Sequence, residues 1–293
     1  MRRYAGLTAA ALVAFSAPAR GESSGVHDTL HGTRSAAMGG AHRAVGTSND
    51  TLYMNPAGMS IRRRYAIEAQ YGYSPFDRLS RVNVSAVDSK TGPVAGAVGY
   101  TYTRGDQDGV DARLHRIFLG TGYALTSNVA FGLTTKHIRG TYNQEGETKE
   151  LSAYTGDLGL MLNFGGLGIG VSYNNVIRTQ AEHLAPPTVG TGLSFGGSGF
   201  TLAADANLNL SDMDNIDVSY HAGAEYLAGG AFPLRLGYER SSFPRADGSR
   251  APENLITAGV AWVTRTGGVD LAYRHSVNRP ENWQLVGALK LFL

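Results

Sequence analysis

From residue 65 to residue 292, hydrophobic and polar residues alternate with a period of two. Clusters of Gly, Ser, Asn, Asp and Pro interrupt this alternation at regular intervals. The pattern predicts about fourteen strands of roughly 9–14 residues, the length that a tilted strand needs to cross a bilayer. The predicted strands cover residues 65–74, 79–88, 93–104, 112–125, 128–142, 151–164, 167–177, 187–196, 199–210, 216–228, 231–240, 254–264, 268–276 and 282–292.

The connections between these segments alternate in length. Every second connection is tight and rich in Gly, Ser or Asn: residues 88–92, 126–128, 165–166, 196–199, 229–230 and 265–267. The others are longer or more charged, as in residues 105–111, 143–150, 178–186 and 241–253. Short periplasmic turns and long outer loops are typical of outer-membrane β-barrels. The sequence therefore predicts an all-β fold, a transmembrane antiparallel barrel of about fourteen strands.

The two faces of each predicted strand differ in polarity. In residues 199–210, the apolar face holds Phe200, Leu202, Ala204, Ala206, Leu208 and Leu210, and the other holds Thr201, Ala203, Asp205, Asn207 and Asn209. A soluble β-sandwich would alternate in the same way, with its apolar face on a core. The strongly charged second face favours a wet barrel lumen, in which opposite charges pair across strands. Its members include Glu68, Gln70, Arg81, Lys136, Asp157, Asp205, Asp217, Glu225, Arg235, Glu239, Asp270, Arg274 and Lys290.

Aromatic residues gather at the two ends of the apolar face, whereas a sandwich core would spread them along its strands. The outer group is Tyr73, Tyr100, Tyr102, Tyr173, Tyr220, Tyr238, Tyr273 and Trp283, and the periplasmic group is Tyr123, Tyr226, Phe232 and Trp262. Amphipathic rings prefer the headgroup level of a membrane, so two such belts indicate a bilayer-spanning barrel.

The first nineteen residues have the pattern of a secretory signal peptide. Met1-Arg2-Arg3 supplies positive charge, residues 4–15 are apolar, and Ala17-Pro18-Ala19 offers a cleavage site. The apolar run is shorter than the roughly 20 residues of a spanning helix. We expect a signal peptide in residues 1–19, an N-terminal segment in residues 20–62 and the barrel in residues 63–293.

Composition excludes several kinds of chemistry. A net charge of +2 and the lack of a long basic stripe give no case for nucleic acid, and the absence of cysteine excludes disulfides and thiolate sites. The eight histidines show no metal-ligand spacing, and we place His221 and His275 at solvated lumen or loop-end positions. Residues 192–196 match G-x-S-x-G but sit at a strand end, not on the strand-to-helix turn that a hydrolase needs. We expect no cofactor, no metal and no enzymatic activity.

Residues 34–60 read RSAAMGGAHRAVGTSNDTLYMNPAGMS and follow neither strand nor helix periodicity. This small-residue and glycine run, polar-acidic step, aromatic residue and NPAG motif resemble the N-terminal signature of FadL-like outer-membrane transport proteins, including PorV-like relatives. The resemblance implies a fourteen-stranded barrel with an N-terminal hatch that passes hydrophobic compounds across the bacterial outer membrane. It assigns the hatch or substrate path to Asp50, Tyr53, Asn55, Pro56, Ala57 and Gly58.

Other interpretations remain open at this stage. PorV-like relatives act in protein secretion as partner-binding barrels, an outer-membrane enzyme is a third possibility, and residues 20–62 could be a disordered lead-in. Beyond a hydrophobic small molecule, we expect as partners outer-membrane lipid and lipopolysaccharide, because residues 241–253 are polar and basic. The assembly machinery is expected to read the last strand, although Leu293 follows the aromatic Phe292.

Overall fold

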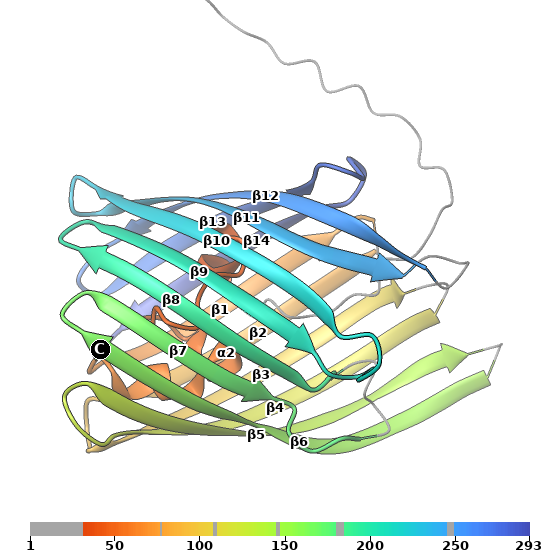
Figure 1. Cartoon of the computed structure of the whole chain (residues 1–293), viewed down its shortest axis with the longest axis horizontal. Coiled ribbons are helices and arrows are strands. Elements are labelled where there is room, and N and C mark those ends of the chain that lie inside the picture. Colours follow the sequence, from red (N-terminus) through yellow and green to blue (C-terminus); the bar gives the residue numbers. More distant parts are fainter. Residues whose placement is uncertain (1–31, 77, 108–109, 145–146, 180–184, 245–248) are drawn as a thin grey trace, which may run out of the picture.

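The computed structural model describes residues 32–76, 78–107, 110–144, 147–179, 185–244 and 249–293. The expected signal peptide and residues 20–31 lie outside the described residues. The described chain forms a closed antiparallel barrel of fourteen strands in sequence order, in which β1 pairs with β14 (Figure 1). The described part holds no helix that is long and apolar enough to cross a membrane. The all-β barrel that the alternation predicts is confirmed.

The strands run β1 Tyr65–Ser74, β2 Leu79–Asp88, β3 Val94–Gln107, β4 Val110–Ala124, β5 Val129–Gln144, β6 Glu147–Phe164, β7 Leu167–Asn174, β8 Thr188–Gly197, β9 Phe200–Asn209, β10 Asp217–Ala228, β11 Phe232–Pro244, β12 Arg250–Val263, β13 Gly267–Ser276 and β14 Trp283–Phe292. Three short helical elements precede them: α1 Thr33–Ala37, α2 Thr51–Met54 and the 3₁₀ helix η1 Pro56–Ser60.

Three connections predicted as outer loops are mostly strand. Residues 105–111 and 143–150 fall largely in the hairpins β3–β4 and β5–β6, and residues 241–253 fall largely in β11–β12, where Ser241 pairs with Glu253. Beyond the membrane a hairpin has no lipid-facing side, so its sequence loses the alternation while its backbone hydrogen bonds continue. The predicted outer loops 105–111, 143–150 and 241–253 are therefore wrong where the structure describes them as strand, and residues 108–109, 145–146 and 245–248 lie outside the described residues.

The outer surface of the barrel is apolar. Leu236 is 67% exposed, and the belt residues Tyr123, Tyr226, Tyr220 and Trp262 are exposed in the same way. An apolar band with aromatic residues at both edges faces lipid in outer-membrane barrels. The two aromatic groups that the sequence predicts therefore lie on the membrane-facing surface.

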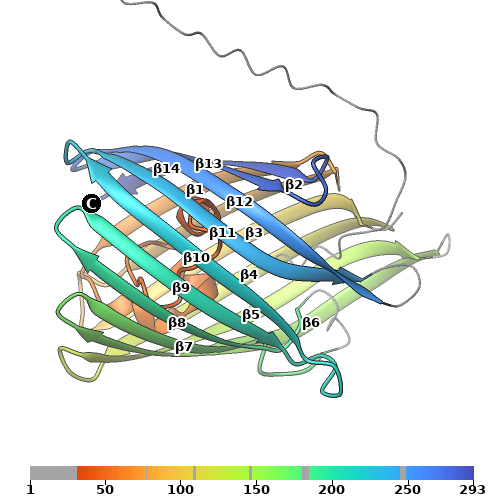
Figure 2. The same ribbon diagram turned by 45° about the horizontal axis from the view of Figure 1, so that its top comes forward.

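The inner surface is polar, and its charges pair across strands as predicted. Glu225 and Arg235 are direct partners on β10 and β11, and Glu68 and Lys290 are direct partners on β1 and β14. Figure 2 shows α1, α2 and η1 enclosed by the strands. The interior thus holds both charged side chains and the N-terminal part of the described chain.

Candidate functional site

Residues 32–62, named here the luminal segment, lie inside the barrel. Every residue from Gly32 to Met59 is buried except Val45 and Thr47, which are half-buried. The apolar surface of the segment is too small for a core of its own, so the barrel wall supplies the burial. The segment contacts the wall both through ion pairs and through apolar packing.

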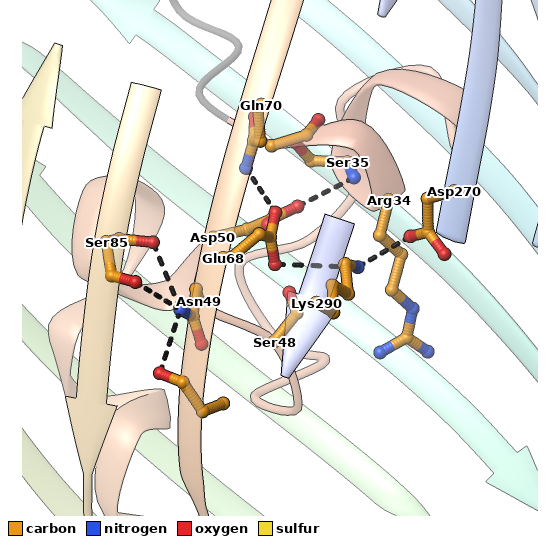
Figure 3. Close-up of polar contacts among 12 residues, drawn as sticks. Arg34, Ser35, Ser48, Asn49, Asp50, Glu68, Gln70, Ser85, Asp270 and Lys290 are labelled. Atoms are coloured by element: carbon orange, nitrogen blue, oxygen red, sulfur yellow. Dashed lines mark hydrogen bonds and ion pairs between the residues drawn. The ribbon is translucent and has the colours of Figure 1, made fainter. Parts of the chain in front are cut away.

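The ionic contacts join the start of the segment to a chain of charges on the wall. Arg34 Nη2 lies 2.6 Å from Glu225 Oε1, and Arg235 Nε donates to Glu225 Oε2 at 2.6 Å. Arg235 also reaches Asp270, whose Oδ2 lies 2.5 Å from Lys290 Nζ. Figure 3 shows the ion pair between Asp270 and Lys290 and also labels Arg34. Because each carboxylate in the chain has a cationic partner, the charges are held in the interior without the full desolvation cost of single ions.

Two aspartates fix the backbone of the segment. Asp205 Oδ2 accepts hydrogen bonds from the backbone N–H groups of His42 and Arg43, both at 2.9 Å. Within the segment, Asp50 Oδ2 accepts from the Ser35 N–H at 2.8 Å, at the start of α1 (Figure 3). Carboxylates that accept from backbone N–H groups form charge-assisted hydrogen bonds, which are stronger than neutral ones. Asp205 ties the segment to β9, and Asp50 joins its two halves.

One apolar cluster of the segment lies against β2–β4. Leu52, Tyr53, Met54 and Met59 form one buried cluster with Val87, Ala95 and Phe118. The rings of Tyr53 and Phe118 meet edge to face, with centroids 4.8 Å apart, and the Tyr53 hydroxyl lies 2.8 Å from Asn83 Nδ2. Such an aromatic pair contributes about 0.5–1.5 kcal/mol beyond the area it buries. This burial also raises the pKa of Tyr53, so its hydroxyl stays protonated.

Asn55 connects three separate pieces of the chain at the start of η1. Its Oδ1 accepts from Ala57 N–H at 3.2 Å, and its Nδ2 donates to the carbonyl oxygens of Arg43 at 2.8 Å and Leu160 at 3.1 Å. Pro56 occupies the first turn of η1, where a missing N–H does no harm. The side chain therefore joins the NPAG turn to the first half of the segment and to β6.

A row of glycines on the wall makes room for this turn. Gly122, Gly132 and Gly159 are direct partners across β4, β5 and β6. A Cβ on Gly132 would lie 2.1 Å from the carbonyl carbon of Pro56, and one on Gly159 would lie 2.2 Å from Asn55 Oδ1. No side chain fits in that space, so the row is the seat of the NPAG turn. Sequence reasoning missed it, although glycines at inward strand positions were the available signal.

His42 is buried between the two halves of the segment, and its Nε2 lies 2.9 Å from Ser48 Oγ. Burial lowers the pKa of His42 to about 4, against the opposing effect of the nearby Asp50 carboxylate. Arg34 and Arg64 act in the same direction as burial, and Glu225 opposes it. The imidazole is therefore neutral in the docked segment at neutral pH.

The structure brings the six residues of the predicted site into one buried segment. Asp50 makes polar contacts in this segment and Tyr53 makes apolar ones. Asn55, Pro56, Ala57 and Gly58 form the turn that lies on the glycine row. One sequence interpretation changes. His221 is buried, not solvated, and its Nδ1 lies 2.7 Å from Gly39 O. Ser194, in the G-x-S-x-G pattern, donates to Ala44 O at 2.7 Å. No group of metal-ligating side chains occurs in the described ranges.

A second apolar cluster lies in the lumen near the outer end of β4–β6. It consists of Leu114, Ile138, Leu151, Ala153 and Ala185. Lys136 lies two residues from Ile138 along β5, further from the outer end. Its Nζ lies 2.6 Å from Asp157 Oδ1 and 2.9 Å from Asn175 Oδ1, and it also lies over the Phe118 ring. Leu114 and Phe118 both face inward on β4. The cluster and the Tyr53–Phe118 pair are thus joined along one strand.

Comparison with known proteins supports the fold. No family model and no curated protein matches the sequence. Among solved structures, the chain is similar to the CymD monoaromatic hydrocarbon channel, with 15% identity over 92% of this chain and 97% of that one and a TM-score of 0.68. The Ralstonia pickettii toluene transporter TbuX has 13% identity over 90% and 98%, with a TM-score of 0.67. A Pseudomonas aeruginosa FadL homologue has 9% identity over 89% and 97%, also with a TM-score of 0.67.

At these identities the likeness establishes the fold, and it agrees with the apolar outer surface of an outer-membrane barrel. The chain therefore has the fold of the FadL-like outer-membrane transport proteins, the family that residues 34–60 resemble.

Proposed function

We propose that this protein passes small hydrophobic compounds across the bacterial outer membrane and that the luminal segment is its hatch. The observation that carries the proposal is the seating of this segment inside the barrel, on the glycine row and on the charges of the wall. Fourteen strands enclose more space than their side chains fill, since eight strands are just fillable. An unfilled lumen would pass water and ions.

The apolar residues suggest where a hydrophobic compound would contact the protein. The cluster around Leu114 and Ile138 would receive it near the outer end, and Phe118 with Tyr53 would meet it at the segment. The similar structures include channels named for monoaromatic hydrocarbons and toluene, which favours small apolar compounds over polar solutes. Neither the contacts nor the comparisons favour a secretion partner or an enzyme.

The remaining expectations stand as proposals. Residues 1–19 would be removed on export, Asp50, Tyr53 and the turn Asn55–Gly58 would form the hatch, and the β-barrel assembly machinery would insert the chain. No cofactor is required for passage of this kind.

The test is uptake of radiolabelled toluene by Gram-negative cells, whose lipopolysaccharide leaflet slows apolar compounds. Cells that produce the parent protein should take up toluene faster than cells without it, and a polar sugar should enter at the same rate in both. Deletion of residues 34–60 should admit the sugar and raise the conductance of planar bilayers. Unchanged toluene uptake with the parent would refute transport, and unchanged conductance after the deletion would refute the hatch.

A further inference from the structure

Two cationic residues lie between the two apolar clusters of the lumen. Arg116 lies two residues before Phe118 on β4, and Lys136 is the direct partner of Phe118 on β5. The Arg116 guanidinium reaches away from β5, to β3, where its Nη1 lies 3.5 Å from Thr103 Oγ1. Lys136 lies two residues from Ile138 of the outer cluster. A compound that moves from the outer cluster to Phe118 along β5 therefore passes the Lys136 side chain.

The Lys136 ammonium group is held in one place. Its Nζ donates to Asp157 Oδ1 at 2.6 Å and to Asn175 Oδ1 at 2.9 Å, and the side chain is 9% exposed. Asp157 Oδ1 also accepts from the Asn175 N–H at 2.8 Å, and Asn175 Nδ2 donates to the Pro186 carbonyl oxygen at 2.8 Å. Because both acceptors are fixed in this way, the cation stays inside the lumen.

One donor of this cation remains for a compound in the lumen. An ammonium group has three N–H donors, and Asp157 and Asn175 take two of them. Among the described residues, the other contact of Lys136 is with the face of the Phe118 ring, whose centroid lies 5.9 Å from Nζ. Tyr53 meets the same ring edge to face. The cation therefore lies in a buried site that already presents an aromatic face to it.

The chemistry of this site favours one class of compound. The face of an aromatic ring is negative and attracts an ammonium group, whereas a saturated ring has no such face. A substrate carboxylate would gain no net attraction, because Asp157 balances the charge of Lys136 and would repel it. We propose that Lys136 makes the passage selective for neutral aromatic rings over saturated hydrocarbons and aromatic carboxylates, an inference that rests on the proposed transport function.

Uptake of two matched hydrocarbons by Gram-negative cells tests this assignment. Toluene and methylcyclohexane have the same carbon skeleton and differ in the aromatic ring. Each rate is divided by the rate in cells without the protein, which removes the difference in passive permeation. The parent should accelerate toluene about fivefold more than methylcyclohexane, which is within the energy of a desolvated cation–π contact. Benzoate should not be accelerated.

Three variants separate the cation from the fold. K136M alone would leave Asp157 buried without its cation, so the informative variant is K136M/D157N, which should accelerate both hydrocarbons equally. K136R keeps a cation for Asp157 and for a ring, and it should keep the preference for toluene. Lys90 is exposed in the turn between β2 and β3, so K90M is the matched control and should behave like the parent.

The outcomes distinguish this inference from the transport function. Equal acceleration of both hydrocarbons by the parent would overturn the role of Lys136 and leave transport standing, and it needs no variant. Acceleration of neither would refute transport and the inference together. A K136M/D157N protein that still resists unfolding in unheated gel samples and keeps the preference would also overturn the inference. Faster entry of benzoate than of toluene would identify Lys136 as a carboxylate ligand instead.

Discussion

At the scale of single residues, Asn55 connects parts of the chain that are far apart in sequence. Its amide bonds to Ala57, Arg43 and Leu160, and Asn55→Ala would remove the partner of two buried groups, the Ala57 N–H and the Arg43 carbonyl. An unsatisfied buried group costs about 1–3 kcal/mol. We expect the barrel to keep its resistance to denaturant, because the barrel hydrogen bonds are untouched, while uptake of toluene falls. The measurement is cell uptake beside gel mobility. Asn215→Ala, in an exposed loop, should change neither, and parent-like uptake by Asn55→Ala would count against the hatch.

His42 predicts a dependence on pH. Its pKa is about 4 in the docked segment and would return to 6.5 on release, so the docked state binds fewer protons between these values. Docking should therefore be strongest above pH 6.5 and weaken as the pH falls toward 4, with no further change from this group below 4. Openings in planar bilayers should become more frequent over that range. His42→Gln should abolish this change in opening frequency with pH. An unchanged pH dependence in this variant would assign it to other groups.

At the scale of elements, the glycine row is the seat of the luminal segment. Gly132→Ala would place a Cβ against the Pro56 backbone, where neither the turn nor the strand can yield easily. We expect the barrel to form and the turn to leave its seat, which raises bilayer conductance toward that of the 34–60 deletion. Gly96→Ala is the matched control, since a Cβ there meets nothing within 4 Å. Equal conductance of the two variants would show that the turn does not need its seat.

At the scale of the whole molecule, the order of turns and loops sets the orientation in the membrane. Ser198 lies in the tight turn between β8 and β9, and Asp214 lies in the connection between β9 and β10. Because the chain has no cysteine, single substitutions can report the side. Asp214→Cys should react with an impermeant maleimide on intact cells, and Ser198→Cys only after lysis. The same rule places Asp247, outside the described residues, on the cell surface. Reversed labelling would invert the topology.

The lipid-facing surface makes a prediction about folding. Leu236 is exposed near mid-membrane on β11, so Leu236→Arg should lower the stability of the barrel in bilayers by about 2–4 kcal/mol. Leu236→Ala, which adds no charge, should have a much smaller effect. Reversible unfolding in phospholipid vesicles measures both. Equal stabilities would argue that this face does not contact lipid.

The sequence by itself determined the strands, their faces and the closure of the barrel. Alternation is a local property, since a strand with lipid on one side and water on the other must repeat every two residues. For that reason the bounds of β1 and β2 agree with the sequence pattern, and the inward charges Glu225 and Arg235 pair as expected. The NPAG motif also identified the turn that the glycine row seats.

Only the tertiary structure decided what the inward positions contact. Alternation tells which face a residue occupies, and it carries no information about what fills the lumen. The bonds of Asp205 to His42 and Arg43, and of Arg34 to Glu225, join residues more than 150 positions apart. The burial of His221 and the fit of Pro56 against Gly132 follow from the same enclosure. The sequence pattern also did not predict the outer hairpins. Strands that leave the bilayer lose the lipid-facing side that makes their sequence alternate.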